Sequence, residues 1–295
     1  MTAKIALLPD RGVVSVTGED AAKFLDNIIT NDMALLGTQS AIFAGLLSPQ
    51  GKILFDFFVV KHSDGYLLDV AKDKAAELAK RLSMYKLRAK VAIADVSEQR
   101  AVIVRQDCHI GEHAICIVDP RDKSLWNRCL LLDSKAFGGA LMLVTNKGWG
   151  TPDDYHAHRI ALGVPEGGRD YAFGDAFPHE ALFDQLHGVS FTKGCYVGQE
   201  IVARMEHRGT ARKRVVRVTA DAPLPPTGTE IKAGEVAIGT MGSAAGNLGL
   251  AMLRLDRAAE FEAKGVPLTA GGVTISPDSF DMARLMPKSL DPTGL

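Results

Sequence analysis

The stretch Lys193-Gly194-Cys195-Tyr196-Val197-Gly198-Gln199-Glu200 places one thiol between a cation and a glycine turn. Gly194 and Gly198 allow backbone angles that other residues adopt only at a cost. Apolar residues then recur at positions 197, 201, 202 and 205. This spacing predicts a tight loop over 191–197 and a helix that begins at residue 198. Because a helix start carries partial positive charge, a thiolate placed at Cys195 would be stabilised there.

Cys195 has two interpretations. In the functional one it is a reactive or ligand-facing thiol, which Lys193 and the helix start keep in its thiolate form. In the structural one it is a small half-buried residue at a turn, as many single cysteines are. The combination of Lys, Gly, Cys, Gly, Gln and Glu within so short a run favours the functional interpretation.

The same run resembles the signature of the YgfZ-type folate-binding proteins, relatives of the glycine cleavage T-protein, an aminomethyltransferase. That signature is Lys-Gly-Cys-aromatic-x-Gly-Gln-Glu followed by x-Val-Ala-Arg, and Ile201-Val202-Ala203-Arg204 follows here. Three further strings resemble the family, so the resemblance covers nearly the whole chain. They are Gly-x-Asp-Ala-x-x-Phe-Leu at 18–25 with Thr30-Asn31-Asp32, the run 159–165, and Phe177-Pro178-His179-Glu180.

The resemblance implies an α+β fold with three lobes in a cloverleaf. Two ferredoxin-like α+β lobes with antiparallel sheets and a small C-terminal β-barrel would surround a central cavity. We predict a first lobe over 1–96, a second over 97–165, a connection carrying the Lys-Gly-Cys motif over 166–210, and the barrel over 211–295. In one version of this division, residues 166–205 complete the first lobe.

The hydrophobic pattern predicts the same class of fold. Strands alternate with helices in the N-terminal part, which is typical of helices on one face of an antiparallel sheet. Short strands separated by glycine turns follow Pro223, and they predict a small antiparallel barrel. Thr151 caps a further helix that begins at Pro152. The N-terminal strands are expected at 41–47, 52–61, 66–70, 91–96, 99–106, 113–118, 128–133 and 141–145.

Composition limits the class of protein. The chain has 295 residues, which is long for one core, and its net charge of −1 argues against a protein built to hold nucleic acid. A basic run over 204–217 is either a solvated strand edge or a docking patch for an anion such as the glutamate tail of a folate. No signal peptide or membrane span is visible, and we expect a cytoplasmic protein.

The cysteines and histidines indicate no metal site. None of the four cysteines forms a Cys-x-x-Cys pair, so neither zinc nor a cysteine-ligated cluster is expected within one chain. Cys108, Cys116 and Cys129 lie in or beside apolar runs and are expected to be buried thiols in a reducing compartment. His156 and His158 are two residues apart and therefore do not share a helix face.

The resemblance implies the site residues. Cys195 would be the working group with Lys193 beside it. An aspartate by the reactive nitrogen of the folate in T-proteins matches Asp56, although Phe55 replaces the first of two adjacent acids; a solvent-facing Asp56 is the alternative. Arg159 would point into the cavity, with a surface position as its alternative. The implied folate-binding residues are Asp56, Arg159, Glu180, Tyr196, Gln199, Glu200 and Arg204.

The function implied by the resemblance is that of an accessory protein. It would bind tetrahydrofolate or a one-carbon derivative and support assembly or repair of iron–sulfur clusters, with iron–sulfur enzymes or cluster assembly proteins as partners. The alternative is a folate-dependent aminomethyltransferase, but T-proteins carry Asp in place of Cys195 and a basic residue in place of Gln199. A thiol hydrolase or transferase using His187 or His207 is a third interpretation. The sequence does not predict a conventional enzyme.

Overall fold

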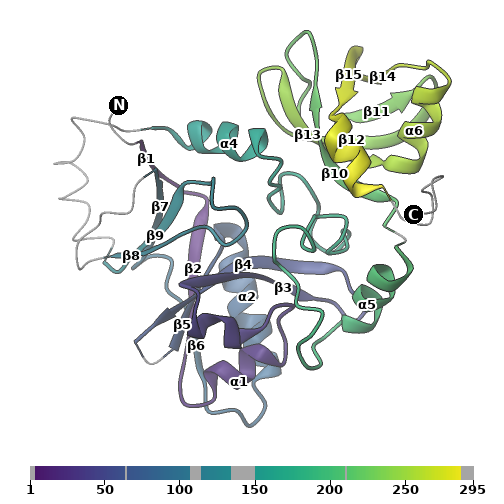
Figure 1. Ribbon diagram of the computed structural model, residues 1–295. Helices are drawn as coiled ribbons and strands as arrows, with labels where there is room; N and C mark the ends of the chain where they lie inside the picture. The colour runs from purple at the N-terminus through teal and green to yellow at the C-terminus, as the bar shows by residue number, and fades with distance from the viewer. Residues whose placement is uncertain (1–3, 64, 107–113, 134–149, 210, 287–295) are drawn as a thin grey trace. The chain divides into compact units, whose positions relative to one another are not determined.

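The computed structural model describes residues 4–63, 65–106, 114–133, 150–209 and 211–286 (Figure 1). The chain divides into two compact units that interleave along the sequence. Unit 1 comprises Met1–Leu47, Leu54–Tyr155 and Leu186–Val197. Unit 2 comprises Ser48–Ile53, His156–Gln185 and Gly198–Leu295. The segment that carries Cys195 therefore belongs to the N-terminal unit.

Unit 1 contains a five-stranded sheet in the order β3–β4–β5–β2–β6. Phe55, Phe57 and Val59 alternate along β4, so their side chains lie on one face, where they join a buried apolar cluster with α1, η1 and α2. This layering of helices on one face of the sheet confirms the predicted α+β class. The bounds are β2 Arg11–Thr17, β3 Ala41–Leu47, β4 Ile53–His62, β5 Gly65–Ala71, β6 Ala92–Asp95, α1 Ala21–Asp26, η1 Met33–Gly37 and α2 Lys72–Tyr85.

A second sheet of unit 1 has the order β1–β7–β9–β8 and is antiparallel throughout. Its strands are β1 Ile5–Leu7, β7 Ala101–Arg105, β8 Ala114–Ile117 and β9 Asn127–Leu131. The strand expected at 141–145 lies outside the described residues, as does Cys108.

The prediction of free core thiols is wrong for two cysteines. Cys116 on β8 and Cys129 on β9 are directly opposite each other in the ladder and form a disulfide. The hydrophobic pattern correctly predicted both strands, but it did not predict the register that brings the two sulfur atoms together.

Unit 2 contains a closed barrel with the strand order β10–β13–β12–β11–β14–β15, which confirms the predicted C-terminal barrel. Two short helices, α6 and α7, were not expected from the sequence. Among the described residues, no helix is long and apolar enough to cross a bilayer. Helix α4, Pro152–Ala161, begins in unit 1 and continues into unit 2 from His156. The other bounds are α5 Gln199–Arg208, β10 Lys213–Thr219, β11 Glu230–Ala233, β12 Val236–Ala245, β13 Leu248–Arg254, α6 Leu255–Ala263, β14 Leu268–Ala270, β15 Val273–Pro277 and α7 Ser279–Leu285.

Candidate functional site

Cys195 is a free thiol with an exposed side chain. It lies in the loop that precedes α5, and Gly198 ends this loop in the left-handed conformation, with φ of 81°. The structure confirms both the predicted loop and the helix after it. An exposed sulfur is available to a ligand or a partner protein, which a sulfur packed in the core would not be.

Lys193 is directed away from solvent. Its side chain is 1% exposed, and its Nζ lies 2.5, 3.1 and 2.7 Å from the carbonyl oxygens of Asp26, Ile29 and Asn31. The Asp26 carboxylate is 3.2 Å away. Burial lowers the pKa of Lys193, and the Asp26 charge opposes that shift. The ammonium is therefore occupied by the turn that follows α1.

Thr30 and Asn31 hold the chain just before this loop. The Thr30 hydroxyl donates to the carbonyl of Gly188 at 2.6 Å and accepts from the amide of Gly45 at 2.8 Å. The Asn31 amide donates to the carbonyls of Phe43 and His187 at 2.7 and 2.6 Å. These two side chains therefore join β3 to a segment that lies more than 150 residues after Thr30 and Asn31 in the sequence.

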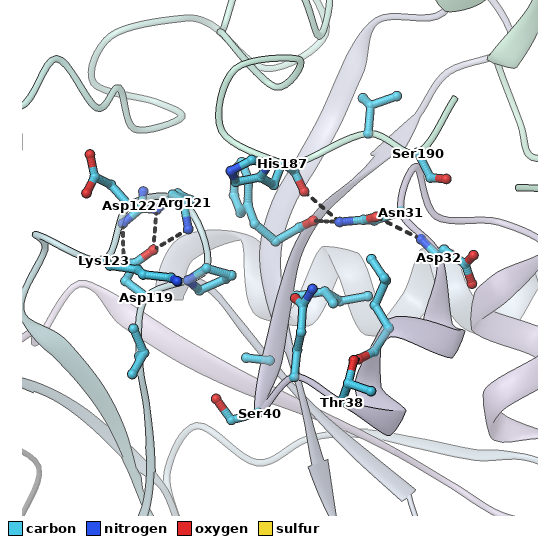
Figure 2. A pocket seen from close by; sticks show the side chains of 18 of the residues that line it. Asn31, Asp32, Thr38, Ser40, Asp119, Arg121, Asp122, Lys123, His187 and Ser190 are labelled. Carbon is cyan, nitrogen blue, oxygen red and sulfur yellow. Dashed lines mark hydrogen bonds and ion pairs between the residues drawn. The ribbon is translucent and has the colours of Figure 1, made fainter. Parts of the chain in front are cut away.

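A pocket of about 790 Å³ opens in unit 1 beside this junction. It is lined by parts of three segments, 31–43, 118–123 and 187–192. Figure 2 shows Asn31 and His187 meeting in the lining, with Asp119 and Arg121 across from them. The third segment ends three residues before Cys195, so the pocket and the exposed thiol share one stretch of chain.

The pocket combines an apolar wall with hydrogen-bonding groups. Phe43 is buried in the wall, while Phe191 and Val118 are exposed large apolar side chains in the lining. Arg121 is held by Asp119 through contacts of 3.0 and 2.8 Å, which fixes it in position. Lys123 adds an exposed cation. Within the described chain, this lining includes none of the nine site residues predicted from the sequence.

In unit 1 the structure places two more of the predicted residues. Tyr196 is buried, and burial raises its pKa to about 12, so its phenol stays protonated at neutral pH. Its ring centroid lies 5.6 Å from Lys193 Nζ. Asp56 is 4% exposed, which excludes the solvent-facing alternative.

In unit 2 the predicted residues have local partners. Arg159 is fully buried and donates to Asp170 and Ser243, each at 2.7 Å, which excludes the surface alternative. The Glu180 carboxylate accepts from the Phe177 amide at 2.8 Å. Three others lie on α5: Gln199 is its first residue, and the exposed Glu200 and Arg204 form an ion pair one turn apart. Exposed pairs of this kind contribute little stability.

The basic run is only partly available to an external anion. Arg214 is buried against Asp184, with a contact of 2.8 Å. Arg217 pairs with Asp281 of α7 and with Asp278, the N-cap of that helix, and the hydrogen bond to Asp281 raises the pKa of Arg217. The sequence could not show this, because the paired acids lie 30 to 64 residues away.

Comparison with known proteins identifies the family. Residues 10–106 match the GCVT N-terminal domain, and residues 212–285 match the C-terminal beta-barrel domain of CAF17. The human iron–sulfur cluster assembly factor IBA57, a mitochondrial protein, is 37% identical over 275 residues, covering 83% of this chain and 76% of the human protein. The chain belongs to the IBA57 family.

Two other IBA57 proteins show the extent of the similarity. The mitochondrial factor of Mus musculus is 34% identical, over 84% of this chain and 76% of the mouse protein. The homologue of the fungus Mycosarcoma maydis is 35% identical over 76% of this chain, but this chain spans only 60% of the fungal protein.

Among solved structures, the aminomethyltransferase T of the glycine cleavage system of Bartonella henselae has a TM-score of 0.75. The superposition covers 96% of this chain and 87% of that protein, with 14% sequence identity. At this identity the likeness shows a shared fold and carries no information on activity. It agrees with the two antiparallel sheets and the barrel described above.

Proposed function

We propose that this IBA57-family protein supports the assembly or repair of iron–sulfur clusters and that Cys195 is its working group. The named relatives are iron–sulfur cluster assembly factors, and the free, exposed thiol of Cys195 is the observation on which the proposal rests. Thiolates are the common protein ligands of iron in such clusters. The Cys195 thiol would release its proton to solvent and donate a sulfur lone pair to an iron atom of a cluster held with a partner protein. That partner would be a cluster assembly protein or the recipient enzyme.

Changing Cys195 to Ser tests this proposal. The variant is expected to lose the ability to restore the activity of an iron–sulfur enzyme in cells that lack the wild-type protein, because a hydroxyl is a poor ligand for iron. Cys108→Ser, which removes a different sulfur, serves as the control. Full restoration by the Cys195→Ser variant, at equal protein abundance, would remove the thiol from the mechanism.

Tetrahydrofolate, or a one-carbon derivative, is the cofactor that we propose for the pocket of unit 1. The pocket volume of about 790 Å³ lies within the range usual for small-molecule sites. Phe43 offers a flat apolar wall to a pterin, Asp32 and Ser190 offer hydrogen-bonding groups, and Lys123 offers a cation to a glutamate tail. The bound folate would supply one-carbon chemistry or a reduced pterin within reach of the Cys195 segment.

A folate titration tests the pocket. Ser40 is exposed and lines the pocket, so a Ser40→Trp variant would obstruct it at little cost to folding. We expect tetrahydrofolate to bind the wild-type protein and the Ser40→Ala control equally, and to bind Ser40→Trp about 10-fold or more weakly, a loss of ~1.4 kcal/mol. Equal binding by the Ser40→Trp variant would place the folate elsewhere, and no binding by the wild type would exclude it as the ligand.

Three alternatives stand beside the proposal. The resemblance implies a folate position beside residues such as Asp56, Arg159 and Glu180, none of which lines the pocket of unit 1. It also leaves an aminomethyltransferase as the alternative, which glycine-dependent transfer with a lipoylated carrier protein would reveal. The sequence predicts a cytoplasmic protein, whereas the named relatives are mitochondrial, and cell fractionation decides between the two.

A further inference from the structure

The Lys193 ammonium has no hydrogen left for a thiolate. An ammonium group carries three N–H donors, and the carbonyls of Asp26, Ile29 and Asn31 lie within hydrogen-bond distance of its Nζ. The Asp26 carboxylate, 3.2 Å away, balances the positive charge. Because the side chain is 1% exposed, solvent does not compete for these contacts. The contacts of Lys193 thus attach the Cys195 loop to the end of α1.

Two uncharged side chains attach the same segment a few residues earlier. Thr30 donates to the carbonyl of Gly188, and Asn31 donates to the carbonyl of His187, both at 2.6 Å. The Ser190 amide donates to the carbonyl of Thr30 at 3.0 Å. The residues that follow α1 therefore contact the segment at 187, 188, 190 and 193, which leaves Cys195 just beyond the last attachment.

We propose that Thr30, Asn31 and Lys193 form a clasp that positions Cys195, and that Lys193 acts in it as a positioning residue. This inference rests on the proposed role of Cys195 and specifies how the fold presents that sulfur. The clasp holds the loop by its carbonyls and by one buried ammonium, so the thiol is presented outward. The clasp also holds residues 187–190, part of which lines the pocket. The shape of the pocket and the position of the Cys195 thiol therefore depend on the same contacts.

Two roles of Lys193 can be distinguished by experiment: it positions the Cys195 loop, or its charge stabilises the Cys195 thiolate. If Lys193 stabilised the thiolate by its charge, the Lys193→Met variant would need a higher pH for half-maximal alkylation of Cys195, and Thr30→Val would have no effect. If Lys193 positions the loop, both variants would release it, although only one removes a charge. Thr30→Val is nearly isosteric, so it removes the hydrogen bonds of the hydroxyl without changing packing volume.

The experiment compares Lys193→Met and Thr30→Val with Lys23→Met, which removes an exposed cation from α1 outside the clasp. We expect hydrogen exchange of the amides in 188–197 to be about 10-fold faster in the first two variants, corresponding to ~1.4 kcal/mol of lost attachment. The pH of half-maximal alkylation should stay at the wild-type value in all three. Restoration of iron–sulfur enzyme activity should fall in the two clasp variants only.

Each contrary outcome is informative. A higher alkylation midpoint in Lys193→Met, together with a silent Thr30→Val variant, would overturn the clasp in favour of activation by charge. Wild-type exchange rates over 188–197 in both clasp variants would also overturn it. If the exchange rates rise as expected but Cys195→Ser retains full activity, the proposed role of the thiol fails while the attachment of the loop stands.

Discussion

An Asp69→Asn variant is expected to lose about 3–5 kcal/mol of unfolding free energy, the usual cost of removing one partner from a buried ion pair. The Asp69 side chain is fully buried on β5, and its two oxygens accept from Arg11 and Arg128, each at 2.7 Å. An asparagine cannot neutralise two guanidinium groups. The variant would therefore leave Arg11 and Arg128 buried in unit 1 without the negative charge that lies between them.

The surroundings of Asp69 increase this cost. Burial alone would lower the pKa of Arg128, but interactions led by the negative charge of Asp69 raise it overall. Arg128 lies over the ring of Phe58, with its guanidinium carbon 4.2 Å from the ring centroid, and donates to the Tyr155 hydroxyl at 3.0 Å. The same hydroxyl accepts from Arg121 of the pocket lining at 3.0 Å. Loss of Asp69 is therefore expected to disturb the pocket as well as the core.

Urea unfolding followed by tryptophan fluorescence measures the loss of unfolding free energy. Trp126 reports on this region because its ring centroid lies 6.2 Å from that of Tyr155. Asp221→Asn changes an exposed aspartate in the same way, and we expect it to alter stability by less than about 0.5 kcal/mol. If Asp69→Asn unfolded at the same urea concentration as the Asp221→Asn control, the ion-pair network would contribute no net stability to unit 1.

The sequence predicted the elements better than it predicted their contacts. The alternation of apolar residues along β4 and the glycine turns of the barrel are local signals, and both led to correct elements. Thr30 and Asn31 also stood out in the sequence, as part of a string that resembles the family. Their partners at 187 and 188 could not be predicted, because hydrogen bonds over that separation depend on the folded chain.

In the candidate site too, local features were predicted from the sequence and long-range contacts were not. The exposed loop around Cys195 follows from Gly194 and Gly198, which are local features. The orientation of Lys193 does not, because neighbouring residues in a loop can point in opposite directions. The pocket of unit 1 was not predicted from its own residues, since three separate segments build it, and Asn31 and Asp32 stood out only as part of a family string. Short helices such as α7 were missed because a single turn or two leaves too little periodicity to detect.

Arg159 belongs to a buried ion pair in unit 2, as Asp69 does in unit 1. An Arg159→Met variant is expected to lose about 3–5 kcal/mol of the unfolding free energy of unit 2. Its guanidinium donates to the carboxylate of Asp170 at 2.7 Å and to the carbonyl of Val164 at 3.1 Å. It also donates to the hydroxyl of Ser243 on β12. One side chain thus joins the end of α4 to a strand of the barrel, and methionine would fill the volume without these bonds.

Most of the expected loss of stability comes from the Asp170 carboxylate, which would lose its arginine partner. It is fully buried and also accepts from the amides of Ser243 and Glu166, at 2.7 and 2.8 Å. In the Arg159→Met variant, the buried negative charge of Asp170 would no longer be paired with Arg159. The double variant Arg159→Met with Asp170→Asn is therefore expected to be more stable than Arg159→Met alone, because it removes the buried charge that has lost its partner. The Ser243 and Glu166 amides donate to different oxygens of Asp170, so asparagine keeps only one of these two bonds, and the removed charge outweighs the lost bond.

Scanning calorimetry of the single and double variants tests this coupling between the two positions. Arg257→Met, which removes an exposed arginine paired with Glu260 on α6, is the matched control, and we expect it to cost less than about 0.5 kcal/mol. A double variant as unstable as the sum of its two single changes would mean that Arg159 and Asp170 contribute independently. A stable Arg159→Met variant with weakened folate binding would instead restore the ligand-facing role that the family resemblance implies for Arg159.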